Sequence, residues 1–280
     1  MAEKETFGKG FENGSFGDLH VHTNYSESAL ACDGTAAPER LVDLAEEGGH
    51  SFIAITDHDT IASSVRGKEY ALKQGYKVEV IVGAEISTTQ GHILALNLQE
   101  NIPFWSEPPD TVREIHSQGG LAISAHPFYS LTSSLKEAGL NEVAYHNDPE
   151  IYWDGMEVFN AGANDFRFYE WVRHFTDGNR VARKFYTNHE SENLYGAAIG
   201  GSDTHTSRIG RALTIIPPEM DIYTAIKANK TGVIITDLKE NYSPKIMYQI
   251  DKKGKDLNKS RHQVPADLKV FPNPWPRLAV

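Results

Sequence analysis

The sequence predicts an α/β fold in one main domain, because short apolar runs alternate with segments of helical periodicity along most of the chain. Each run is nearly continuous in apolar residues, which is typical of strands covered on both faces. The runs span residues 16–21, 51–56, 78–86, 92–98, 121–125, 155–160, 197–201, 212–216 and 232–236. Strands that alternate with helices predict a parallel sheet with right-handed crossovers, either open or closed into a barrel.

The intervening segments carry helix start and stop signals. Residues 38–49 begin with Pro38 in a first-turn position, place Leu41 and Leu44 on one face and end in two glycines. Residues 109–120 repeat this plan from Pro109. Further helices are expected in 61–75, 163–188 and 221–232.

Composition divides the chain into three parts. Its 280 residues, with 40% hydrophobic content, suffice for one sizeable core. We expect a flexible N-terminal arm over 1–15 and a barrel or open-sheet domain over 16–240. Residues 241–280, which are rich in Lys and Pro and have no clear helical period, are expected to form an extended C-terminal appendage.

Several protein classes are disfavoured. No apolar stretch is long enough for a membrane span, and residues 1–14 contain no apolar core of a signal peptide, so a cytoplasmic location without membrane association is expected. Cys32 is the single cysteine, which excludes a thiolate zinc cluster. The formal net charge of −11 argues against a basic nucleic-acid-binding face, so no stable nucleic-acid partner is expected. The sequence gives no basis for an oligomeric state.

Ionisable residues gather where the expected strands end, which is where barrel active sites are built. Each of these histidines and acids lies at the end of an expected strand, directly follows one, or opens the next. The set comprises His20, His22, His58, Glu85, His92, His126, Asp203 and His205. His20 and His22 are two residues apart, as are Asp203 and His205, so each pair can present its side chains to one face. Imidazoles with carboxylates suit zinc, manganese or iron as divalent ions.

Each piece has an ordinary explanation when it is taken alone. A lone histidine pair on a strand is commonly a hydrogen-bonded, partly buried pair, and His126 could simply precede the turn at Pro127. Asp203 could cap a loop. The combination at five strand ends is nevertheless a strong signal for a metal site.

Five motifs, in this order and at these distances, resemble those of the PHP (polymerase and histidinol phosphatase) superfamily of metal-dependent phosphoesterases. They are "DLHVHTNYS", "ITDHDT", "GAEIS", "SAHP" and "GGSDTH", and the resemblance spans about residues 16–236. It implies a distorted (β/α)7 TIM-like barrel, here with the short extended C-terminal appendage, and two or three divalent metal ions (Zn, Mn or Fe) at the strands' carboxyl ends.

The resemblance also implies a ligand set. His20, His22, Glu85 and Asp203 would hold a first ion, and Glu85 would bridge to a second ion held by His126 and His92. His58 and His205 would help to hold a third. In related sequences an Asp shortly after the histidine pair completes the third site. Here Asp33 of "CDGT" is the preferred candidate, because "DGTAAPERLV" continues into the helix as the family pattern does, and Glu27 is the alternative.

Such a site would hydrolyse a small phosphorylated substrate, a monoester or nucleotide-like ester, through a metal-bridging hydroxide. Glu85, Asp203 and His205 are the expected catalytic residues, with Arg208 contacting the remaining phosphate oxygens. Asn160 is expected at the same mouth, and Asp57 is expected to orient a ligand. One alternative is an amidohydrolase-like enzyme that cleaves a carboxyl ester, lactone or amide, although no Lys stands at a strand end to bridge metals. The other is a barrel retained only as a scaffold.

The other histidines are expected to be structural or solvated: His50, His116, His146, His174, His189 and His262. Aromatic residues between 128 and 195 are candidates for a specificity wall, although such residues are more often core. They are Phe128, Tyr129, Trp153, Phe159, Phe166 and Phe168.

Overall fold

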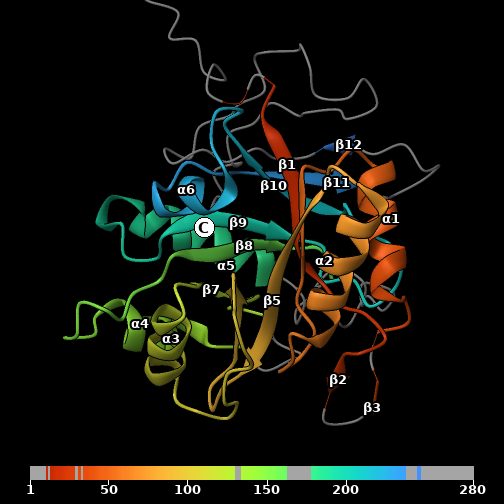
Figure 1. Cartoon of the computed structure of the whole chain (residues 1–280). Helices are drawn as coiled ribbons and strands as arrows, with labels where there is room; N and C mark the ends of the chain where they lie inside the picture. The colour runs from red at the N-terminus through yellow and green to blue at the C-terminus, as the bar shows by residue number, and fades with distance from the viewer. Residues whose placement is uncertain are drawn as a thin grey trace, which may run out of the picture.

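A single large sheet with helices packed around it forms the core of the protein (Figure 1). The computed structural model describes residues 11, 13–28, 31–32, 34–129, 134–162, 178–237 and 245–246. The strands are β1 (Ser15–Val21), β2 (Glu27–Ser28), β3 (Ala31–Cys32), β4 (Phe52–Ile55), β5 (Glu79–Ser87), β6 (His92–Leu96), β7 (Leu121–Ser124), β8 (Gly155–Asn160), β9 (Ala197–Gly201), β10 (Ala212–Ile216), β11 (Gly232–Asp237) and β12 (Lys245–Ile246). The helices are α1 (Pro38–Glu47), α2 (Ala62–Gln74), α3 (Pro108–Ser117), α4 (Lys136–Ala144), α5 (Gly178–His189), the 3-10 turn η3 (Glu190–Glu192) and α6 (Ile222–Lys227).

The sheet has ten strands in the order β12-β11-β10-β1-β4-β5-β6-β7-β8-β9 and is nearly closed, which confirms the expected α/β barrel class. It is mixed rather than parallel throughout, and it has more strands than the seven that the family resemblance implied. β6 runs antiparallel to β5 and β7, because residues 88–91 form only a hairpin connection and a parallel crossover needs a much longer one. β10, β11 and β12 are also antiparallel to their neighbours.

The two ends of the barrel meet where β9 leaves the sheet beside β1. The Asp203 amide donates to the His20 carbonyl at 2.7 Å, and the His22 amide donates to the Thr204 carbonyl at 2.9 Å. Val21 and Thr204 form a parallel bridge at the same point. The segment that carries Asp203 and His205 is therefore fixed directly against the segment that carries His20 and His22.

Two strands contain an extra residue at this end of the barrel. From Asp18 to Val21, β1 advances three residues while its partner β4 advances two. From Glu157 to Phe159, β8 advances two residues while its partner β9 advances one. Such bulges bend a strand and change which side its side chains face. Leu19 accordingly packs in the barrel interior, whereas Val21 packs outside against α1.

Helices cover the outside of the sheet in pairs. α1 and α2 lie together beside β4 and β5, and α3 and α4 lie together beside β7 (Figure 1). α6 lies at the end opposite to β2 and β3 in this view, and its Ile222, Ala225 and Ile226 join the interior cluster. That end is filled by apolar side chains, so the polar residues are concentrated at the other end.

Some expected segments fall partly outside the described residues. Only α5 is described of the helix expected over 163–188, and α4 was not expected. Most of the N-terminal arm and of the 241–280 appendage also lies outside, apart from the start of β1 and the short β12. Among the described helices, none has the length and apolarity needed to cross a membrane.

Candidate metal centre

Most of the described candidate residues lie together at the carboxyl ends of β1, β4, β5, β7 and β9. His92 opens β6 instead, and it reaches the same rim because β6 is antiparallel and pairs His92 with Ser87. His126 and Asp203 adopt left-handed backbone conformations, with φ of 26° and 45°. Non-glycine residues rarely do so, and such strain is concentrated at functional sites.

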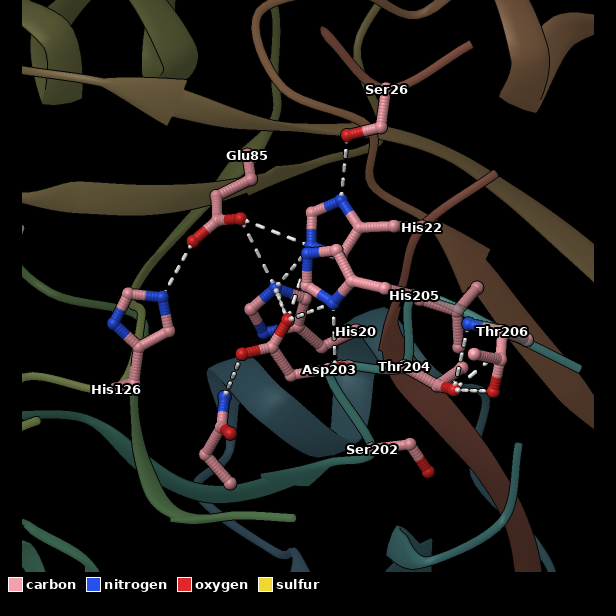
Figure 2. A network of polar contacts seen from close by, with 12 residues as sticks. His20, His22, Ser26, Glu85, His126, Ser202, Asp203, Thr204, His205 and Thr206 are labelled. Atoms are coloured by element: carbon pink, nitrogen blue, oxygen red, sulfur yellow. Dashed lines mark hydrogen bonds and ion pairs between the residues drawn. The ribbon is translucent and has the colours of Figure 1, made fainter. Parts of the chain in front are cut away.

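Four side chains bring one donor atom each to a common point. Figure 2 shows His20, His22, Glu85 and Asp203 directed toward one another. The two histidine Nε2 atoms are 3.1 Å apart, and they lie 3.3 and 3.2 Å from Glu85 Oε2. Asp203 Oδ1 lies 3.4 Å from His20 Nε2 and 3.2 Å from His22 Nε2. All four residues are buried or nearly so.

These spacings match the donor set of a metal ion. Ligands about 2.0–2.1 Å from a tetrahedrally coordinated zinc lie about 3.3 Å from one another. The five separations given above, 3.1–3.4 Å, match five of the six edges of such a tetrahedron. The residues present therefore fit a divalent cation in both chemistry and spacing.

The second carboxylate oxygen of Glu85 faces two further histidines. Glu85 Oε1 lies 3.0 Å from His92 Nδ1 and 2.8 Å from His126 Nε2. One buried carboxylate thus stands between two groups of imidazoles. This is the arrangement that a bridge between two ions requires.

His58 and His205 lie beside His22. Their rings are centred 4.9 and 4.4 Å from the His22 ring, and the three offer nitrogen atoms that lie within 4.8 Å of one another. His58 Nδ1 also lies 3.4 Å from Glu85 Oε2. The side chain of His205 is 38% exposed, so it is accessible from solvent.

Glu157 supports the cluster, and the sequence reasoning missed it. Its Oε1 lies 3.2 Å from His20 Nδ1, and its Oε2 accepts hydrogen bonds from the His126 amide at 2.7 Å and from Asn160 Nδ2 at 3.0 Å. Asn160 also donates to Asp203 Oδ2 at 3.0 Å and is only 1% exposed, so it belongs to this buried network and not to the open mouth. A lone acid within the apolar run "GMEVFN" was the available signal, because a buried charge needs partners.

Other polar residues hold the strand ends in place. Asp57 accepts hydrogen bonds from the Thr23 amide at 2.6 Å and from the Ser63 hydroxyl. It lies 4.0 Å from His22 Nδ1, whereas Ser26 Oγ lies 3.1 Å from that atom, so Ser26 is the hydrogen-bond partner of the His22 ring. Asp18 is a second missed acid, and it accepts from the Ser202 and Gly210 amides at 2.9 Å each.

Charge complementarity in the cluster shifts the titration of its members. Burial disfavours the charged form of His20, but the carboxylates of Asp203, Glu85 and Glu157 outweigh it and raise its pKa well above the usual value. Burial likewise opposes ionisation of Glu85, yet the surrounding histidines hold its pKa well below the usual value. The protonated histidines attract the carboxylates. A divalent cation bound at this position would supply the same positive charge in place of the protons.

The remaining candidates lie elsewhere. Arg208 is exposed on the loop after β9, and Asp33 and the side chain of Glu27 are outside the described residues. His50, His116, His146 and His189 stand apart from the cluster, in agreement with their expected structural roles. His116 contacts Asp154 at 2.9 Å, and His189 contacts the Phe185 carbonyl at 2.8 Å. His174 and His262 are outside the described residues.

The chain belongs to the PHP domain family, whose model matches residues 18–209. This family is one of metal-dependent hydrolases, which agrees with the imidazole and carboxylate cluster. A Methanocaldococcus jannaschii protein of uncharacterized function is 37% identical over 153 residues, covering 53% of this chain and 83% of that protein. The 5'-3' exoribonuclease Rnm of Escherichia coli is 38% identical over 94 residues, which cover 32% of this chain and 30% of Rnm.

Solved structures share the fold at low sequence identity. A two-domain protein of Bacteroides vulgatus, described as containing a PHP-like metal-dependent phosphoesterase, aligns with a TM-score of 0.57 and 20% identity over 84% of this chain and 69% of that one. An amidohydrolase of Chromobacterium violaceum aligns with a TM-score of 0.52 and 17% identity over 80% and 99% of the two chains. The Rnm similarity weakens the expectation that nucleic acid is not a partner.

Proposed function

We propose that this protein is a metal-dependent phosphoesterase that hydrolyses a small phosphate ester. The observation that carries the proposal is the convergence of His20, His22, Glu85 and Asp203 at separations of 3.1–3.4 Å, with the second Glu85 oxygen facing two more histidines. Phosphoryl transfer depends mainly on positioning and on neutralising charge. A cluster able to hold two or three cations suits that chemistry.

The ligand roles follow the donor groups. His20, His22, Glu85 and Asp203 would hold one ion, and Glu85, His92 and His126 a second. A third would lie near His58 and His205, with Asp33 or Glu27 completing it. When bound, divalent cations supply a nucleophile derived from water at neutral pH and neutralise charge on the phosphoryl group.

The protein's own groups would orient and protonate. Glu157 and Ser26 hold the Nδ1 atoms of His20 and His22, so that both Nε2 atoms face the common point. His205 is accessible, and its Nδ1 lies 3.2 Å from the Asp203 carbonyl, so its ring has a fixed position from which Nε2 would protonate the leaving group when it holds no third ion. Arg208, three residues along the same loop, would contact the outer phosphate oxygens.

Nucleic acid ends are a second candidate substrate. The exoribonuclease Rnm matches about a third of this chain, so a terminal phosphodiester is a substrate to test beside small monoesters. An amidohydrolase activity is a third candidate, supported by the C. violaceum neighbour through the fold alone.

One experiment separates these activities. The purified protein is analysed for bound metals and then assayed with p-nitrophenyl phosphate, bis-p-nitrophenyl phosphate and p-nitrophenyl acetate, with and without manganese. Metal-dependent turnover of a phosphate ester is expected, and Asp203→Asn should abolish it. Asp221→Asn, at the exposed cap of α6, is the matched control and should leave turnover unchanged. Turnover of acetate alone would support the amidohydrolase, and no turnover in a metal-loaded protein would contradict hydrolysis of these esters.

A further inference from the structure

Two neighbouring aromatic side chains are exposed on the loop between β6 and α3. Phe104 is 54% exposed and Trp105 is 59% exposed. Aromatic rings of this size normally contribute to a core, and no other adjacent pair of large apolar residues is comparably exposed in the part of the chain that is described. By contrast, Tyr129, Trp153 and Phe159, which the sequence offered as a specificity wall, are buried.

The loop is attached to the rim of the metal centre. The Trp105 amide donates to the Ser87 carbonyl at 2.7 Å, and the Thr89 amide donates to the Ser106 carbonyl at 3.0 Å. Ser87 ends β5, two residues after Glu85. On the same edge of β5, the Ser87 amide donates to Asp59 Oδ1 at 2.7 Å, and Asp59 follows His58 directly. Trp105 is therefore anchored to the strand of one proposed ligand and beside the loop of another.

Trp105 has a backbone conformation that is unusual for its size. Its φ is 61°, in the left-handed region, which bulky residues rarely adopt and which costs about 1 kcal/mol or more. A glycine or asparagine would be more stable there. A strained, exposed tryptophan beside a candidate active site points to a role in binding.

The spacing suits a substrate with a phosphate at one end and a ring at the other. Ser87 lies two residues along β5 from Glu85, and the Trp105 backbone lies about one interstrand spacing from Ser87. Together these two steps place the Trp105 backbone about 8 Å from the Glu85 backbone. The two backbones are therefore close enough for one small ester to contact both the metal centre and this loop. The net charge of −11 provides no basic track for a long nucleic acid, so a single base is favoured over an extended strand.

We propose that Phe104 and Trp105 form an aromatic shelf that stacks against the base of a nucleotide whose phosphate lies at the metal centre. This inference rests on the proposed phosphoesterase function and names its substrate class. Base stacking on aromatic side chains needs no hydrogen-bond partner, so the shelf distinguishes esters that carry a base from esters that do not.

Trp105→Asn tests the shelf, because asparagine tolerates the left-handed backbone and removes the ring without a folding penalty. In the manganese-loaded protein, KM for adenosine monophosphate should rise about 10-fold, while KM for ribose 5-phosphate stays unchanged. Trp105→Phe should restore most of the difference. Tyr145→Ala is the control, because Tyr145 is equally exposed at 59% and contacts Glu192, away from the rim.

A binding measurement separates the shelf from the reaction. A non-cleavable phosphonate analogue of adenosine monophosphate should quench tryptophan fluorescence in the wild type and not in Trp105→Asn. Equal KM changes for both esters, or no change for either, would overturn the shelf while leaving the phosphoesterase intact. Quenching that depends on Trp105 in a protein that cleaves no phosphate ester would support the shelf and contradict the proposed function.

Discussion

Glu85 has more contacts within the cluster than any single ion pair would need. Its Oε2 lies within 3.4 Å of His20, His22 and His58, and its Oε1 lies within 3.0 Å of His92 and His126. The side chain is 1% exposed, so water cannot replace a missing partner. One residue therefore holds the two halves of the centre together.

Glu85→Gln should abolish activity and lower the metal content with little change in fold. The amide has nearly the same shape but lacks the negative charge, and one of its two ends is no longer a ligand. Metal per chain measured by plasma mass spectrometry, together with circular dichroism, checks this. His189→Ala, at the end of α5, should keep its metal. A fully metallated, active Glu85→Gln protein would exclude the bridging role.

Glu157→Gln should weaken metal binding without removing a ligand. Loss of the charge next to His20 Nδ1 makes that ring a poorer ligand, and outer carboxylates of this kind typically contribute 10–100-fold to metal affinity. Competition with a chromophoric chelator measures the change, and Glu150→Gln on the exposed loop before β8 is the control. Unchanged affinity in Glu157→Gln would show that Glu157 only fills space.

His50 should make stability depend on pH. Burial lowers its pKa to about 4, below the unfolded value of 6.5, so the unfolded chain binds the proton first. The folded state is therefore destabilised as pH falls from 6.5 toward 4, by about 2 kcal/mol between pH 7 and pH 5. Asp18, with a pKa raised to about 6 by burial, acts in the opposite direction over the same range.

The free energy of unfolding in urea is measured at pH 7 and pH 5 for the wild type and for His50→Gln. Because Asp18 is present in both proteins, the difference between them isolates the contribution of His50. The variant should lose less stability than the wild type on acidification. Identical losses in the two proteins would show that His50 is protonated in the folded state.

At the level of strands, the two bulges bring the side chains of the centre to one side. In β1 the extra residue accompanies the change from Leu19 in the interior to Val21 outside, and in β8 it places Glu157 and Asn160 in one network. Alternation alone would put residues three apart on opposite faces. Bulges near active sites commonly redirect side chains in this way.

Gly201 in β9 is required for this close packing. A Cβ atom there would lie 2.5 Å from His20 Cβ and 2.6 Å from Glu157 Oε1. Gly201→Ala should therefore destabilise the protein by about 1–3 kcal/mol and reduce metal binding, because His20 must move. Gly49→Ala is the control, because Gly49 has a φ of 70° that strains an alanine but a Cβ atom there would have no neighbour within 4 Å. This variant should lose about 1 kcal/mol of stability and retain bound metal. Calorimetry and metal analysis of both variants provide the test.

The strand positions and the residue types gathered in the cluster could be predicted because both follow from local rules. Apolar runs mark strands, and His58, Glu85 and His126 stand where those runs end. The direction of β6, the bulges and the role of Glu157 depend on partners far along the chain, so no local pattern specifies them. Asp57 shows the same limit: its place next to His58 suggested that it orients a ligand, and its short hydrogen bonds to Thr23 and Ser63 were not foreseen.

For the whole molecule, bound cations should be a main source of stability. Metal-free, the cluster relies on protonated histidines beside Glu85 and Asp203. A cation present at about 100 times its dissociation constant adds about 2.7 kcal/mol to the free energy of unfolding, which raises Tm by about 5–10 °C in a chain of this size. Scanning calorimetry before and after chelation, with zinc or manganese restored, checks this. An unchanged Tm would contradict preferential binding of the ions to the folded chain.

The junction between β9 and β1 has a consequence for synthesis. Asp18 and Ser202 touch across 184 residues of sequence, and Asp203 is fixed by the His20 carbonyl. A growing chain on the ribosome has the histidine pair early but lacks Asp203 until most of the domain has emerged. With the ligand set proposed above, tight metal binding would come late in biogenesis, after the last of these strands has been made.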